Sequence, residues 1–283
     1  MSPIKLEKNI SLSNFTTWRI GGPAEWIAQP KNIEEIKYLT NWINKKKIPC
    51  NLIGAGSNLL INDKGIEGLS LCMRNFKGTK IDKNNGIIEV LSGEMLPTLA
   101  RKAATNGLHG LEWAVGIPGT IGGAVVMNAG AQDHCLSRYV ESITTLSLQG
   151  EYKTIKGKDL NFGYRYSMLQ NEKLIVISTR LKLKLGYAEK IRQITNENLN
   201  HRLKTQPYNE QTCGSVFRNP EPLKAAKLIE ELGLKGFRVG GAEISEKHSN
   251  FIINANKASS HDVRELIKYI QKRVFNSYGI LLE

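Results

Sequence analysis

The sequence lacks the paired cysteines that hold zinc or build a disulfide framework. Its four cysteines, at positions 50, 72, 135 and 213, are scattered and form no CxxC pair, so neither a zinc site nor a disulfide scaffold is indicated. The five histidines are not clustered either. We therefore predict no metal site.

Long apolar runs are also missing. No window offers the roughly 18–20 uninterrupted apolar residues that a membrane helix needs. The N-terminal residues, Met1-Ser-Pro-Ile-Lys-Leu-Glu-Lys8, lack the apolar core of a signal peptide. We predict a cytoplasmic protein without a membrane span, and the sequence does not indicate an oligomeric state.

Acidic residues are scarce relative to basic ones, with 26 Asp and Glu against 39 Lys and Arg and a formal net charge of +13. Such a charge attracts anions. The lysines are dispersed, however, and no basic stripe is interleaved with aromatic residues, so we predict no nucleic-acid partner. A solvated lysine-rich surface explains the charge, and a phosphorylated small substrate would benefit from the same field.

The length of 283 residues fits two or three modest domains. Apolar spacing and glycine stops predict helices at about 32–47, 95–107, 188–204 and 222–232. A capping box at Ser259-Ser-His-Asp262 predicts a further helix from 259 onward. Strands are expected at 50–54, 59–61, 139–149, 173–184, 237–244, 250–254 and 278–283, and as short pieces within 66–93 that include a hairpin turn at Asp82–Gly86. The pair Gln206-Pro207 indicates a domain boundary nearby.

The stretch from Gly116 to Ala131 combines many glycines with almost no charge. Glycine stands at positions 116, 119, 122, 123 and 130, without a helical or strand period. Glycine is unfavourable inside helices and strands and serves where the backbone has a positive φ or approaches another group closely. The stretch is predicted to be buried backbone wrapped around a flat ligand or another chain segment, with a tight packing corner as the alternative.

A second loop of small residues, Gly54-Ala-Gly-Ser-Asn58, follows the predicted strand at 50–54. Such a loop can expose backbone N–H groups in a concave nest that binds phosphate oxygens. It is not the GxGxxG dinucleotide fingerprint, because the helix that this motif requires does not follow. A plain turn is the alternative.

Two further turns place reactive side chains among small residues. In Phe162-Gly-Tyr-Arg-Tyr-Ser167, Arg165 could offer fixed N–H donors to an oxyanion or carboxylate, or it could be a surface arginine stacked on the tyrosines. In Cys213-Gly-Ser-Val-Phe217, Ser215 could act as a proton donor, or it could be an ordinary turn serine. No GxSxG motif indicates a serine hydrolase.

Taken together, these pieces resemble the UDP-N-acetylenolpyruvoylglucosamine reductase family, flavoproteins of bacterial peptidoglycan precursor synthesis. The motifs follow the family's order along almost the whole chain: Thr17-Trp-Arg-Ile-Gly-Gly22, Gly54–Asn58, Gly116–Gly123, Asn128–Ala131, Tyr164–Ser167, Cys213–Pro220 and Lys247–Phe251. The lack of an inserted tyrosine-bearing loop before the predicted helix 188–204 is similar to the family's shorter, type II form.

The resemblance implies an α+β fold, with a two-subdomain FAD-binding fold of the vanillyl-alcohol oxidase (PCMH) type and a C-terminal α+β substrate domain. We expect these parts at 1–77, 78–204 and 205–283. It also implies bound FAD, NADPH as the hydride donor, and reduction of UDP-N-acetylglucosamine enolpyruvate to UDP-N-acetylmuramate. The expected partner is thus a small molecule, the enolpyruvyl ether of a UDP-amino sugar.

Site residues follow from the resemblance position by position. Arg165 would stabilise the developing enolate and Ser215 would protonate it. The substrate's diphosphate or sugar would contact Tyr164, Arg218 and Asn219. The FAD pyrophosphate would be held by Gly54, Ala55, Gly56, Ser57 and Asn58. The rest of the cofactor would be lined by Gly116, Pro118, Gly119, Thr120, Gly122, Gly123, Asn128, Gly130 and Ala131. The family's catalytic glutamate lies two residues beyond the position matched by Glu283, so we do not expect Glu283 to have that role.

Overall fold

The computed structural model describes residues 4–283, and residues 1–3, at the start of the first predicted domain, lie outside the described residues. The chain divides into two compact units. Unit 1 comprises the described residues up to Lys8 together with Trp26–Ala55 and Glu67–His201. Unit 2 comprises Asn9–Glu25, Gly56–Ile66 and Arg202–Glu283. The division into 1–77, 78–204 and 205–283 stays a prediction.

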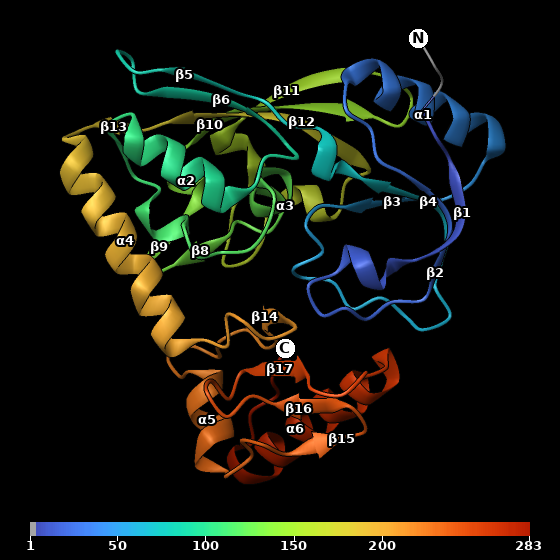
Figure 1. Cartoon of the computed structure of the whole chain (residues 1–283), viewed down its shortest axis with the longest axis vertical. Coiled ribbons are helices and arrows are strands. Elements are labelled where there is room, and N and C mark those ends of the chain that lie inside the picture. The colour runs from blue at the N-terminus through green and yellow to red at the C-terminus, as the bar shows by residue number, and fades with distance from the viewer. Residues whose placement is uncertain (1–3) are drawn as a thin grey trace. The chain divides into compact units, whose positions relative to one another are not determined.

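The larger sheet of unit 1 has five antiparallel strands in the order β11-β10-β12-β6-β5 (Figure 1). These strands are β5 (Thr79–Asp82), β6 (Ile87–Leu91), β10 (Val140–Ser147), β11 (Tyr152–Lys156) and β12 (Leu174–Lys182). The hairpin turn predicted between β5 and β6 is confirmed. The Asp82 carboxylate accepts hydrogen bonds from the N–H groups of Asn84 and Asn85, as aspartates at the start of turns commonly do.

Two helices of unit 1 belong to the core of this sheet. Helix α2 (Leu96–Thr105) buries the face that its spacing predicts and is followed by Gly107 at φ +70, the left-handed residue that ends many helices. Helix α3 (Ile121–Val126) packs against β6 and β12. The fully buried Ile88, Leu96 and Ile121 lie in the same apolar core, which fixes the glycine stretch against the sheet.

A four-stranded sheet has the order β1-β2-β4-β3, formed by β1 (Glu7–Ser11), β2 (Pro23–Ala28), β3 (Cys50–Ile53) and β4 (Ile66–Cys72). Strands β3 and β4 run parallel. The predicted helix α1 (Ile33–Lys46) begins after Asn32, whose side chain accepts from the Glu35 N–H at 2.9 Å. The strand predicted at 59–61 is wrong. There the apolar side chains are explained by core packing, since Ile61 is buried and Leu60 packs on the unit 2 core.

Three smaller features complete unit 1. Strand β7 (Leu108–His109) pairs with β13 (Lys184–Leu185), and β8 (Gly130–Ala131) pairs with β9 (His134–Cys135). Helix α4 (Ala188–Thr205) confirms the helix predicted over 188–204. The boundary between the units falls within α4, between His201 and Arg202.

Unit 2 holds an antiparallel sheet of order β14-β17-β16-β15 and two helices (Figure 1). Its elements are β14 (Thr212–Ser215), α5 (Ala225–Glu231), β15 (Arg238–Val239), β16 (Ala242–Ile244), β17 (Phe251–Asn254) and α6 (Ser260–Tyr278). The capping box predicted at the start of α6 is confirmed, with Ser259 and Asp262 bonded reciprocally. Helix α6 packs against β15 and β16.

Two predictions at element ends in unit 2 are wrong. The helix expected from Pro222 begins at Ala225, because a turn in which the Leu223 N–H donates to the Pro220 carbonyl precedes it. The strand expected at 278–283 is absent. Helix α6 continues to Tyr278, and residues 280–283 form no regular element.

Long-range hydrogen bonds join the N-terminal segments of unit 2 to its C-terminal part. The Trp18 indole Nε1 donates to the Ile252 carbonyl at 2.7 Å. The Asp63 carboxylate accepts from the Ser260 N–H and hydroxyl, each at 2.8 Å, and from the His261 N–H at 3.2 Å. Asp63 therefore satisfies two N–H groups in the first turn of α6 that have no partner within the helix.

Candidate functional site

The loop at 54–58 turns three successive carbonyls toward protein donors. The Arg74 guanidinium donates from Nε to the Gly54 carbonyl at 3.2 Å and from Nη2 to the Ala55 carbonyl. The Thr17 N–H donates to the Gly56 carbonyl at 3.1 Å. Because the N–H of a trans peptide points opposite to its carbonyl, the N–H that follows each carbonyl points away from these donors.

Gly56 gives this loop its left-handed bend. Its φ is +66, and a Cβ added there would lie 1.9 Å from the Phe15 carbonyl oxygen, so only glycine fits. Outward-pointing N–H groups next to a left-handed residue are the arrangement of an anion-binding nest. The loop also carries no acidic side chain. Its residues therefore fit a diphosphate such as that of FAD.

Close contacts within unit 1 explain several glycines of the site. A Cβ on Gly122 would lie 2.8 Å from a neighbouring side chain, and one on Gly130 would lie 2.4 Å from a neighbouring carbonyl. A Cβ on Gly54 would lie 2.5 Å from the Thr120 Oγ1. The packing alternative thus accounts for these positions, and the last contact brings the start of the 54–58 loop against the glycine stretch.

The N–H groups at the start of α3 are used by the protein itself. Those of Ile121 and Gly122 donate to carbonyls of the segment 92–94 at 2.8 and 2.9 Å. The Gly123 N–H donates to the Thr120 hydroxyl at 3.4 Å. At the start of α3 the stretch therefore packs around the chain segment 92–94, and these three N–H groups have protein acceptors.

Asn128, predicted to contact the cofactor, has both ends of its side chain engaged within unit 1. Its Nδ2 donates to the Gly163 carbonyl at 2.8 Å, and its Oδ1 accepts from the Ser137 N–H at 3.0 Å. The residue is buried and its φ is +41, a conformation that asparagine tolerates better than most residues. Asn128 thereby holds the turn that carries Arg165.

Arg165 lies in a tight turn in which Gly163 and Tyr166 exchange two backbone hydrogen bonds of 3.0 and 3.2 Å. Its φ of +55 is left-handed, which costs a non-glycine residue about 1–2 kcal/mol. The guanidinium donates from Nη2 to the Gly130 carbonyl at 2.6 Å and lies 5.1 Å from the ring centre of Tyr164. The guanidinium is thus both hydrogen-bonded to the protein and placed beside a tyrosine ring, and its role in catalysis stays a prediction. Backbone strain of this kind is often found at functional sites.

The second group of predicted residues lies in unit 2. Ser215 ends β14, is exposed, and follows Gly214 at φ +86. Among residues 4–283 its hydroxyl has no hydrogen-bond partner. The Arg218 N–H donates to the Glu283 carbonyl at 2.7 Å. The Asn219 Oδ1 accepts from the N–H of Ala225, the first residue of α5, at 3.2 Å.

The structure thus gathers the predicted residues into two groups, one in each unit. In unit 1, Thr120 adjoins Gly54, and Gly130 binds Arg165. In the same unit Gly116 is buried, Pro118 is exposed, and Ala131 pairs with His134. The group in unit 2 contains Gly56, Ser57, Asn58, Ser215, Arg218 and Asn219. The ligand contacts of all these residues stay predictions.

Sequence reasoning missed the residues that hold the site in place. Thr17 stands in one of the family motifs, but its backbone bond to Gly56 has no signal in the sequence. Arg74 stands in no motif, although its guanidinium orients two carbonyls of the 54–58 loop. Both contacts join residues that lie far apart in the sequence, so they form only in the folded chain.

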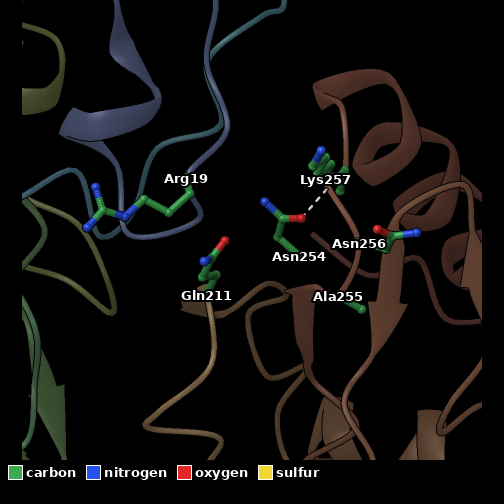
Figure 2. A pocket seen from close by; sticks show the side chains of 7 residues that line it. Arg19, Gln211, Asn254, Ala255, Asn256 and Lys257 are labelled. Atoms are coloured by element: carbon green, nitrogen blue, oxygen red, sulfur yellow. Dashed lines mark hydrogen bonds between the residues drawn. The ribbon is translucent and has the colours of Figure 1, made fainter.

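An open cavity of about 500 Å³ lies within unit 2 and contains none of the predicted site residues. Its lining residues are Arg19, Gln211, Asn254, Ala255, Asn256, Lys257 and Ala258. Figure 2 shows the Arg19 guanidinium extending away from Asn254. The Asn254 carboxamide is bound within the protein, to the Trp18 carbonyl and the Ala258 N–H.

Within residues 4–283, no three His, Cys, Asp or Glu side chains are grouped so that they could hold a metal ion. In the same range no helix has the length and apolar character needed to traverse a bilayer.

Two family models match the chain. Residues 24–156 match an FAD binding domain, and residues 206–283 match the C-terminal domain of UDP-N-acetylenolpyruvoylglucosamine reductase. The predicted fold class, an FAD-binding fold of the PCMH type with a C-terminal α+β domain, is confirmed by these matches and by the solved structure described next.

Similar proteins with this enzyme name cover nearly the whole chain. The reductase of Prochlorococcus marinus (strain NATL2A) is 85% identical over 283 residues, which are 100% of this chain and 97% of that protein. The reductase of Synechocystis sp. (strain ATCC 27184 / PCC 6803 / Kazusa) is 46% identical over 98% of this chain and 89% of its own length. The crystal structure of the reductase (MurB) from Thermus caldophilus matches with a TM-score of 0.83 and 36% identity, covering 95% of each chain. The chain belongs to the UDP-N-acetylenolpyruvoylglucosamine reductase family.

Proposed function

We propose that this chain is an FAD enzyme that reduces UDP-N-acetylglucosamine enolpyruvate to UDP-N-acetylmuramate, a step in peptidoglycan precursor synthesis. The observation that carries the proposal is the 54–58 loop. Its carbonyls accept from Arg74 and Thr17, which turns the N–H groups that follow them to the other side of the loop, where an anion could bind. Because the chain belongs to a family with an FAD binding domain, we propose that this anion is the diphosphate of FAD.

The residues that would hold the cofactor come from two segments. The 54–58 loop would bind the diphosphate through backbone N–H groups, and the stretch from Gly116 to Ala131 would line the remainder. FAD, when bound, accepts a hydride equivalent and delivers it to the substrate double bond. We propose NADPH as the reductant, so that one hydride and one proton are added to the enolpyruvyl group in each turnover.

Arg165 would stabilise the negative charge that develops on the enolpyruvyl group. A guanidinium has five N–H donors, and the Gly130 carbonyl occupies Nη2, so the other donors can face an oxyanion. A charge held in a fixed turn needs little reorganisation when the substrate reacts, which is the basis of electrostatic catalysis. Tyr164, beside the guanidinium, would contact the substrate's diphosphate or sugar.

Ser215 would donate the proton that completes the reduction. Its hydroxyl is exposed and makes no hydrogen bond within residues 4–283, so it is available to a ligand. A neutral hydroxyl is a weak acid and needs a cationic environment to act as one. Arg218 and Asn219 follow it closely in the chain and would bind the substrate. We also propose a cytoplasmic location and the three-domain division at 1–77, 78–204 and 205–283.

The test separates the two half-reactions of the purified holoenzyme. We expect a flavin absorption spectrum that NADPH bleaches under anaerobic conditions and that the enolpyruvyl substrate restores. Ser215→Ala should keep the rate of bleaching and slow restoration about 10²- to 10⁴-fold, the usual contribution of a general acid. Ser277→Ala, an exposed serine of α6, serves as the matched control and should change neither rate.

Different failures have different meanings. A colourless protein that cannot be reconstituted with FAD would refute the whole proposal. Equal loss of both half-reactions in Ser215→Ala would refute only the role of Ser215, because a proton donor to the substrate does not take part in flavin reduction.

A further inference from the structure

The turn that carries Arg165 is held by a residue with no part in the proposed chemistry. Gln170 is exposed and ends a short 3-10 turn, Met168–Gln170. Its Nε2 donates to the Arg165 carbonyl at 3.0 Å and to the Val126 carbonyl at 3.1 Å. Nε2 also lies 3.7 Å from the Met127 Sδ. A carboxamide NH2 group has two hydrogens, and the two shorter contacts, to the carbonyls, account for both.

Both acceptors are carbonyls that need a donor from outside their own element. Val126 is the last residue of α3, where carbonyls lack a partner within the helix. The buried Ser167 hydroxyl also donates to it, at 2.7 Å. The Arg165 carbonyl belongs to the left-handed residue of the turn. One side chain therefore joins the end of α3 to the backbone of the strained arginine.

The segment 126–130, which begins with Val126, also accepts a hydrogen bond from the Arg165 guanidinium. Its Nη2 donates to the Gly130 carbonyl at 2.6 Å. From the same segment, the Asn128 Nδ2 donates to the carbonyl of Gly163, two residues before Arg165, at 2.8 Å. Residues 126–130 thus fix both the backbone of the arginine, through Gln170, and its guanidinium.

We propose that Gln170 is a positioning residue that keeps Arg165 in the geometry required for reduction of the enolpyruvyl group. The inference rests on the proposed role of Arg165. Without the two hydrogen bonds from Gln170, the left-handed φ of Arg165 can relax to negative values. The guanidinium then keeps its charge but is aimed elsewhere, and a displacement of about 1 Å at a reacting group can slow a reaction about 10²-fold.

The test uses Gln170→Leu in the holoenzyme, which removes the donors and keeps most of the volume. We expect an unchanged flavin spectrum and an unchanged rate of flavin reduction by NADPH. Reoxidation by the enolpyruvyl substrate should slow about 10- to 100-fold, with little change in the KM for substrate. Gln170→Glu should behave alike, because a carboxylate cannot donate. Gln193→Leu, which removes a surface bond to Glu197 on α4, should change nothing.

A double variant identifies the path of the effect. If Gln170 acts through Arg165, adding Gln170→Leu to Arg165→Ala should slow reoxidation no further. Additive slowing would overturn the inference, as would a normal rate in both Gln170 variants while Arg165→Ala is slow. A normal rate in Arg165→Ala itself would overturn the proposed role of Arg165 and the inference with it. These outcomes keep the two failures distinguishable.

Discussion

Replacing Gly56 by alanine should weaken FAD binding, and the structure indicates by how much. The new Cβ would lie 1.9 Å from the Phe15 carbonyl oxygen, whereas real Cβ atoms essentially never approach within 3.0 Å. Either the loop or the carbonyl must therefore move by at least about 1.1 Å. A shift of that size breaks a hydrogen bond to a charged group, worth about 1.5–3 kcal/mol. We expect FAD affinity to fall about 10- to 100-fold.

The assay is titration of apoprotein with FAD, followed by flavin fluorescence, and unit 2 offers a closely matched control. Gly233 has the same φ of +66, but a Cβ there would meet nothing within 4 Å. Gly233→Ala thus imposes the same backbone strain without the clash. It should lower the free energy of unfolding by about 1–2 kcal/mol and leave FAD affinity unchanged. Equal FAD affinity in the two variants would refute our account of the 54–58 loop.

Three further predictions concern the contacts that hold the site. Burial raises the pKa of Asp63, but hydrogen bonds from the first turn of α6 outweigh it and hold the pKa below its usual range. The stability that this carboxylate contributes is therefore present above about pH 4 and lost as the pH falls through the lowered pKa. Asp63→Asn should cost about 1 kcal/mol at pH 7 in urea unfolding and flatten this acid dependence. Asp159→Asn, at an exposed aspartate of unit 1, should leave the free energy of unfolding at pH 7 unchanged. Arg74→Met should weaken FAD binding about tenfold in the same titration, because two loop carbonyls lose their donor; unchanged affinity would contradict this. Trp18→Phe leaves the Ile252 carbonyl without its indole donor and should lower the free energy of unfolding by about 1–3 kcal/mol; a change below 0.5 kcal/mol would contradict it.

Local signals predicted the parts of the fold whose causes are local. The capping box of α6 and the turn at Asp82 each need only neighbouring residues, and both are confirmed. The expected strand at 59–61 failed because apolar content does not tell a strand from a loop packed on a core. The strand at 278–283 failed because a helix continued through Tyr278.

The candidate site divides in the same way. Small-residue loops and the placement of Arg165 between two tyrosines are visible in the sequence, and they pointed to the segments that the structure shows held in place. The groups that hold them are not visible. Arg74 and Gln170 donate to backbone carbonyls of other segments. Because every residue has a backbone carbonyl, the sequence does not indicate which one will accept such a bond. The left-handed φ of Arg165 is likewise a property of the assembled turn.

The assembly of unit 2 from three separate segments has a consequence for biosynthesis. The bond from Trp18 to Ile252 joins residues 234 positions apart, and the cap from Asp63 to Ser260 spans 197. At a translation rate of about 5–20 residues per second, the Trp18 side chain waits about 10–50 s for its acceptor to be made. Segments 9–25 and 56–66 are thus exposed on the ribosome while unit 1, which ends at His201, can already fold. Nascent chains stalled before residue 252 should be more sensitive to proteases in these two segments than in the five-stranded sheet.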